Sequence, residues 1–283
     1  MNASAIDHVK SAASSPLVAT PVQQLGDERV WFPHLCHSRS DAWLVSLAFL
    51  HGIALLTWPS IFLIAAGIWW NSNTIAHYFI HLPFFKQRGW NRVFSAYQSL
   101  LLGVPQRLWR ERHLAHHADA RCLFRWSKQF IFEAGLVIAL WTVLLVIAPK
   151  FFLVVYIPGY VLGLCLCILQ GYYEHAHGTT SHYSHLYNSL FFNDGYHVEH
   201  HLHPRAHWLT LPRYRAVNAQ TSSWPAALRW LESINLETLE RFVLRSKFLQ
   251  RFVVTRHLKA FEALLTPGER PEFKTVAIIG GGL

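Results

Sequence analysis

The sequence contains few charged residues, one methionine and four cysteines. Asp, Glu, Lys and Arg make up only 14% of its 283 residues, against about 25% in typical soluble proteins. Hydrophobic residues make up 52%, which excludes intrinsic disorder, because disordered chains combine low hydrophobicity with high charge. The cysteines show no ferredoxin pattern, and Cys165 and Cys167 lie inside an apolar segment. These deficits favour an integral membrane protein over a soluble globule.

Aromatic residues and histidine, by contrast, are abundant. The chain has 12 Trp and 19 Phe, and aromatic side chains collect where a membrane meets water. It also has 19 His, more than its 16 Asp and Glu together. The formal net charge is +9, but the basic residues flank apolar segments and form no dense run. We therefore interpret the charge as a membrane-topology signal and expect no nucleic-acid partner.

Four apolar segments predict the fold class. At 1.5 Å per residue they extend about 25–33 Å, and the hydrocarbon core of a bilayer is about 30 Å thick. Pro59 and Pro149 separate the members of each pair. The segments cover residues 42–58, 60–81, 130–148 and 151–172. We predict an all-α integral membrane protein with four transmembrane helices in two hairpins and a cytosolic helical cap.

The distribution of basic residues predicts the orientation. The linker 82–128 holds nine Lys and Arg but only two acidic residues, which places it in the cytosol with both chain ends. Such a multi-pass protein belongs in a bacterial inner membrane or the endoplasmic reticulum. We expect a cytosolic leader at 1–40, a membrane domain at 41–215, and a cytosolic or interfacial helical tail at 216–283.

Three histidine clusters lie on this cytosolic side. One has the spacing HxxxH and two have the spacing HxxHH, and residues three or four apart share a face of a helix. Imidazole is a common ligand of iron, copper, zinc and nickel. Eight imidazoles exceed the needs of one ion and suit two ions with about four ligands each. The clusters are His77 and His81; His113, His116 and His117; and His197, His200 and His201.

The strings HYFIH, HLAHH and HVEHH, in this order around two hairpins, resemble the membrane fatty acid desaturase and hydroxylase superfamily. The resemblance extends over residues 40–215. It implies that the eight histidines hold a non-haem centre of two iron ions. It also implies an O2-dependent oxidoreductase that acts on the aliphatic chain of a fatty acid or another lipid. Electrons would come from a separate protein, a ferredoxin or a b-type cytochrome. Desaturation is the preferred outcome, and hydroxylation is the alternative.

Members of that superfamily often have a ninth ligand after the fourth span. The string EHAHG is similar to a segment of membrane alkane hydroxylases, which favours His175 over its neighbour His177. His182 and His185 are interpreted as parts of an interfacial loop. We therefore predict His175 as the ninth ligand and keep His177 as the alternative.

Polar residues beside the clusters are candidates for orienting the ligands. A metal-bound histidine usually donates its second N–H to a carboxylate or a carbonyl. The candidates are Asn73, Asp119, Glu174, Asp194 and Glu199. His51, in the middle of the first apolar segment, is expected to pack between helices.

Other functions stay open at the level of sequence. A histidine-rich metal transporter should place ionisable residues deep within several spans, and these spans are nearly free of them. A haem protein and a membrane zinc hydrolase are further alternatives, and metal analysis separates both from a di-iron oxidase. The terminal string VAIIGGGL begins like a nucleotide-binding turn, but it has no helix after it and we assign it no function.

Overall fold

The protein is all-helical over the residues that the structure, a computed structural model, describes: 34–118, 126–176 and 178–233. Within these ranges the only β-pairing consists of isolated bridges, such as the one between Leu35 and Phe85. The predicted all-α class is therefore confirmed for the described residues. The leader up to residue 33 and the string VAIIGGGL lie outside them.

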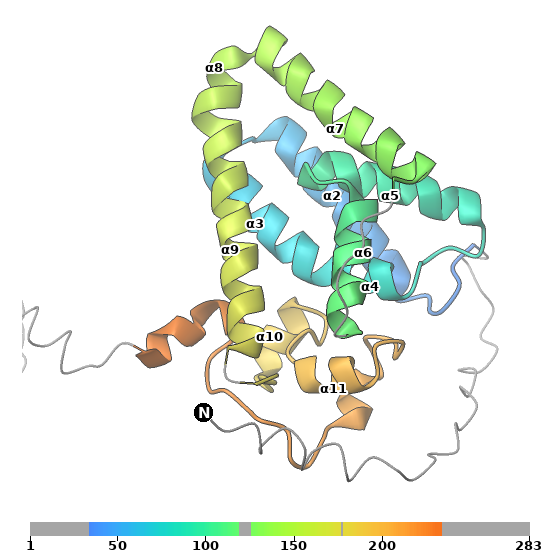
Figure 1. Cartoon of the computed structure of the whole chain (residues 1–283), viewed down its shortest axis with the longest axis vertical. Coiled ribbons are helices and arrows are strands. Elements are labelled where there is room, and N and C mark those ends of the chain that lie inside the picture. The colour runs from blue at the N-terminus through green and yellow to red at the C-terminus, as the bar shows by residue number, and fades with distance from the viewer. Residues whose placement is uncertain (1–33, 119–125, 177, 234–283) are drawn as a thin grey trace, which may run out of the picture.

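Two pairs of helices, two connecting helices and a group of short helices make up the described chain (Figure 1). The first pair is α2 (Asp41–Thr57) and α3 (Ile61–Asn71), which continues through η1 (Ser72–Ala76) and α4 (His77–His81). The connecting helices are α5 (Arg88–Leu102) and α6 (Gln106–His117). The second pair is α7 (Lys128–Ile147) and one continuous helical stretch. That stretch consists of α8 (Pro149–Phe151), η2 (Phe152–Tyr156) and α9 (Ile157–His175). The short helices are α10 (His185–Leu190), α11 (His197–Leu202), η3 (Leu211–Tyr214) and η4 (Ala226–Ser233).

Two of the four predicted spans have the length and apolar composition needed to cross a membrane. They are the helical stretches Lys128–Ile147 and Pro149–His175. Helix α2 is apolar but has only 17 residues. The longer stretch contains the irregular turn η2 just before Pro158, which lacks the N–H that a regular helix uses.

A π-helical turn, η1, directly precedes the first histidine cluster. Its side chains bond to the same helix: Asn73 Nδ2 donates to the Trp69 carbonyl at 2.7 Å, and Thr74 Oγ1 donates to the Trp70 carbonyl at 2.6 Å. Turns of this kind change the direction in which the following side chains point and occur often at functional sites. Here the turn determines the direction in which the side chains of His77 and the residues after it point.

Helices α3 and α9 pack closely because α9 presents two glycines four residues apart. A Cβ atom on Gly159 would lie 2.9 Å from Ile64 Cβ, and one on Gly163 would lie 2.9 Å from Ile68 Cβ. Small residues at this spacing let two helix backbones approach each other within a membrane. The contact holds the last turn of α9 in register with the chain that leads to α4.

The short helices form a cap at one end of the molecule. Figure 1 shows α10 and α11 next to the ends of α4, α6 and α9. Asp41, at the start of α2, ties the cap to the first pair: its Oδ1 accepts from Trp208 Nε1 at 3.0 Å and lies 2.9 Å from His207 Nε2. The ends of helices that are distant in sequence therefore meet beneath one cap.

Candidate metal centre

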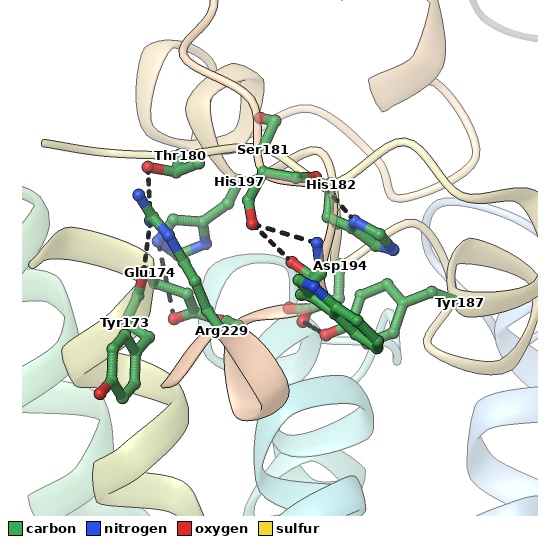
Figure 2. Close-up of a pocket in the computed structure, with 13 residues that line it drawn as sticks. Tyr173, Glu174, Thr180, Ser181, His182, Tyr187, Asp194, His197 and Arg229 are labelled. Atoms are coloured by element: carbon green, nitrogen blue, oxygen red, sulfur yellow. Dashed lines mark hydrogen bonds and ion pairs between the residues drawn. The ribbon is translucent and has the colours of Figure 1, made fainter. Parts of the chain in front are cut away.

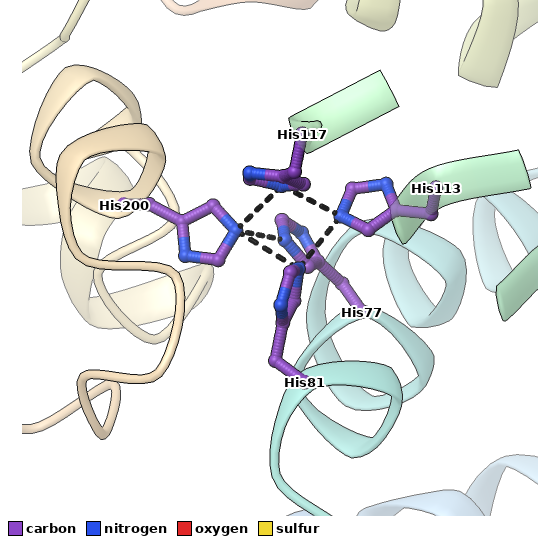
Figure 3. A group of neighbouring side chains, drawn as sticks. All are labelled: His77, His81, His113, His117 and His200. Carbon is purple, nitrogen blue, oxygen red and sulfur yellow. Dashed lines mark hydrogen bonds between the residues drawn. The ribbon is translucent and has the colours of Figure 1, made fainter. Parts of the chain in front are cut away.

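Five histidine side chains point their Nε2 atoms at one point under the cap (Figure 3). They come from the ends of three elements: α4, α6 and α11. His200 Nε2 lies 2.8 Å from His77 Nε2 and 3.2 Å from the Nε2 atoms of His81 and His117. His113 Nε2 lies 2.8 Å from His81 Nε2 and 3.1 Å from His117 Nε2. We call these five side chains the first group.

Hydrogen bonding alone cannot explain the first group. An imidazole nitrogen carries either one proton or one lone pair in the ring plane, so it makes one good hydrogen bond. His200 Nε2 nevertheless has three nitrogen neighbours within 3.2 Å. Neighbouring imidazole nitrogens on one ion, with metal–nitrogen distances of about 2.0–2.1 Å, lie about 2.9–3.4 Å apart. The observed spacings of 2.8–3.2 Å suit lone pairs that share a cation.

Four further histidines form a second group beside the first. His116 Nε2 lies 2.9 Å from His175 Nε2, and His197 Nε2 lies 3.1 Å from the same atom. His201 completes a cluster with His116 and His175, whose ligand atoms all lie within 4.8 Å of one another. The structure therefore brings together all eight histidines of the three clusters and His175. His177 lies outside the described residues.

Burial lowers the pKa of five clustered imidazoles outside the spans. It lowers the pKa of His113, His197 and His200 well below the ordinary value of 6.5, and neighbouring imidazoles lower it further. The same two causes lower the pKa of His117 to about 4 and that of His201 to about 3. Neutral imidazole is the form that binds a metal ion. These five imidazoles can therefore bind a metal ion at pH 7 without first losing a proton.

Two of the predicted carboxylates lie against the histidine groups. Asp194 Oδ1 lies 3.5 Å from Nδ1 of His77, the ring nitrogen that faces away from the first group. Glu174 Oε2 lies 3.7 Å from His197 Nε2 and belongs with His175 and His197 to a cluster of possible ligand atoms. Both arrangements suit residues that orient or complete a metal site.

The other predicted orienting residues have different surroundings. Glu199 is fully buried, and it accepts from Ser181 Oγ at 2.8 Å, Tyr183 OH at 2.5 Å and the Ala216 backbone N–H at 2.9 Å. It thus ties α11 to the loop before it and to the chain after it. Asn73 bonds within its own helix, as described above. Asp119 lies outside the described residues.

The remaining histidines that the sequence singled out stand apart from both groups. His51 is buried between α2 and α3, with Nδ1 3.4 Å from Asn71 Nδ2, as expected for a packing residue. His182 Nδ1 lies 3.0 Å from the Ser222 carbonyl, and His185 is exposed on α10. These three histidines therefore belong to neither group of clustered imidazoles.

A small, open pocket lies beside the second group (Figure 2). Glu174 and His197 line it, together with residues of the following loop. Arg229, from η4, closes one side, where its Nη1 atom donates to the Tyr173 carbonyl at 2.8 Å and to Thr180 Oγ1 at 2.7 Å. The described part of the tail thus covers the end of α9.

Two positioning side chains were missed at the level of sequence. Gln170 is fully buried in α9 and bonds to both Glu174 and Asp194. Glu133 is fully buried in α7 and accepts from the backbone N–H of Arg107 at the start of α6. The sequence did carry one signal for both: each is a polar residue inside an apolar run. Such a residue must find a hydrogen-bond partner when it is buried.

The comparison with known families agrees with the geometry. The sequence model described as fatty acid desaturase matches residues 53–122 and 119–231, which cover more than half of the chain and all nine clustered histidines. No curated protein and no solved structure gave a match. The resemblance found in the histidine strings is thereby confirmed. The chain belongs to the fatty acid desaturase family, whose members are membrane-associated oxidoreductases that act on lipid substrates.

Proposed function

We propose that this protein is an O2-dependent di-iron oxidoreductase that desaturates the aliphatic chain of a fatty acid or another lipid. The observation that supports this proposal best is the convergence of nine imidazoles into two adjoining groups of five and four. The preference for iron comes from the family, since imidazole also binds copper, zinc and nickel.

In this proposal the first iron is held by His77, His81, His113, His117 and His200. The second is held by His116, His175, His197 and His201, with Glu174 beside it. A saturated C–H bond offers no group for acid–base catalysis to act on, so the oxidising power must come from the cofactor. When bound, the iron centre supplies that power from O2 and two electrons. A ferredoxin or a b-type cytochrome delivers the electrons.

The chain itself contributes ligand placement and an apolar surround. Asp194, behind His77, fixes the orientation of that ring, and the cap formed by α10 and α11 limits access of water to the first group. His197 and His200 of α11 are only 4% and 3% exposed, so water has little access to either side chain. The substrate chain is proposed to approach between the spans, where apolar side chains predominate.

We also propose the topology predicted from the sequence, with four spans in two hairpins and the cap and both termini in the cytosol. Outward-facing apolar side chains on both helix pairs support it: Leu56, Phe62 and Ile147 are 86%, 80% and 78% exposed. Such side chains suit contact with lipid. Residues 41–215 form the catalytic domain, 1–40 a leader, and the tail 216–283 begins by packing over that domain.

Expression in a host of defined lipid composition, followed by mass spectrometry, tests the reaction. We expect cellular lipids or acyl chains that lack two hydrogens, and only when O2 is supplied. Products that gain one oxygen atom would instead assign hydroxylation to the same centre. Turnover without O2, together with bound zinc, would contradict the proposal and favour a hydrolase.

A further inference from the structure

Gln170 is hydrogen-bonded at every polar atom of its side chain. Its Nε2 atom donates to Glu174 Oε1 at 2.9 Å and to Asp194 Oδ2 at 3.0 Å. Its Oε1 atom accepts from Trp69 Nε1 at 2.6 Å. An amide has two N–H groups, and here each one has a carboxylate to bond to. The side chain is fully buried, so water does not compete for these bonds.

The two carboxylates lead to different histidine groups. The second oxygen of Asp194 lies 3.5 Å from His77 Nδ1, in the first group. The second oxygen of Glu174 lies 3.7 Å from His197 Nε2, in the second group. A continuous series of polar contacts therefore joins the two groups, and Gln170 stands at its middle.

Tyr187 strengthens one end of this series. Its hydroxyl donates to Asp194 Oδ2 at 2.9 Å. Burial raises the pKa of Tyr187 well above 10, and the neighbouring Asp194 and Glu174 raise it further. Two buried carboxylates this close to each other repel unless a donor lies between them. The amide of Gln170 is placed to reduce this repulsion and to hold both carboxylates in fixed directions.

We propose that Gln170 is a positioning residue shared by the two metal centres, through which the orientation of His77 and the placement of Glu174 are coupled. This inference rests on the proposed di-iron function. It goes beyond that function because it assigns one side chain, which is not a ligand, to both centres at once. Residues behind metal ligands typically change metal affinity by about 10–100-fold when they are replaced.

The test compares Gln170→Met with Gln98→Met in the full-length protein in detergent. Gln98 is the matched control because it is also fully buried, yet its amide atoms have no hydrogen-bond partner in the described part of the chain. Iron retention is measured against a series of chelators, and Mössbauer spectra report on the environment of each iron. We expect Gln170→Met to weaken the binding of both irons by about 10–100-fold and to change both spectral components. We expect Gln98→Met to leave both unchanged.

Three further variants make the test specific. Asp194→Asn should change mainly the component of the first centre, and Glu174→Gln mainly that of the second. Trp69→Phe removes only the donor to Gln170 Oε1. It should shift both components slightly, which keeps the test valid if Gln170→Met fails to fold.

Two results would overturn the inference: Gln170→Met retains both irons with unchanged spectra, or it changes only one component. If the wild-type protein holds two irons, either result rejects only the shared role of Gln170 and leaves the proposed function standing. A wild-type protein with fewer than two irons rejects the proposed function itself.

Discussion

Replacement of His200 with alanine is expected to abolish lipid oxidation and to release iron from the first group. His200 has the most close neighbours in that group, because its Nε2 atom lies within 3.2 Å of the same atom in His77, His81 and His117. It also brings α11 to the ends of α4 and α6, so its loss removes a ligand and the link between the cap and the helix ends.

The measurement pairs iron analysis with lipid mass spectrometry. His185→Ala is the control, since His185 is an exposed histidine on the neighbouring helix α10 and belongs to neither group. The control variant should keep two irons and full activity. Retention of activity by His200→Ala would contradict its assignment as a ligand.

Replacement of Glu133 with alanine is expected to have the second large effect, because Glu133 anchors the helix that carries three ligands. Its carboxylate accepts from Ser95 Oγ at 2.6 Å, Gln129 Nε2 at 2.7 Å and the Arg107 backbone N–H at 2.7 Å. The last bond satisfies a free N–H in the first turn of α6 and places a negative charge where the helix dipole favours it.

Alanine at this position removes the acceptor of three donors, which lie on partly buried residues around the fully buried Glu133. Each unsatisfied buried group costs about 1–3 kcal/mol, and partial access to solvent lowers that cost, so we expect the variant to lose about 3 kcal/mol of stability. The loosened α6 should also reduce iron binding in both groups, because His113 and His117 serve the first and His116 the second.

Thermal unfolding in detergent and iron analysis together check this expectation. Glu133→Gln keeps an acceptor oxygen and should lie between the wild-type protein and Glu133→Ala in both readouts. Glu111→Ala is the control on α6, because Glu111 is only partly buried and pairs within the same helix with Arg107, whose side chain is 37% exposed. Such a pair contributes about 0.5 kcal/mol. Equal stability of Glu133→Ala and Glu111→Ala would show that the anchor has no structural effect.

Much of the candidate centre could be predicted from the sequence because ligand spacing is a local property. The spacings HxxxH and HxxHH place imidazoles on one face of a helix, whatever the rest of the chain does. The cytosolic side rests on the positive charges of the linker and stays a prediction. The choice of His175 over its neighbours came from the resemblance of the string EHAHG, and the structure places His175 between His116 and His197.

What could not be predicted depends on contacts between segments far apart in the chain. Asn73 was expected to support His77 because a regular helix would put the two on one face. The π turn η1 intervenes, and Asn73 bonds to Trp69 in its own helix instead. Gln170 and Glu133 gave no motif, since their partners include Asp194 and Arg107, which lie 24 and 26 residues away in the chain.

The helical class was predictable for a different reason. Long apolar runs without charge must satisfy their backbone hydrogen bonds internally, and a helix does so within one segment. The helical stretches Lys128–Ile147 and Pro149–His175 are long and apolar enough to cross a membrane. The polar residues that precede His77 make the corresponding stretch of the first pair less apolar, and the same residues form the irregular turn η1 before the first histidine cluster.

Metal analysis of the purified full-length protein, combined with Mössbauer spectroscopy, tests the central claim most directly. We predict two non-haem iron ions per chain and two spectral components with nitrogen-rich coordination, matching the groups of five and four histidines. A Soret band from haem, zinc in place of iron, or fewer than two metal ions per chain would contradict the proposed di-iron centre.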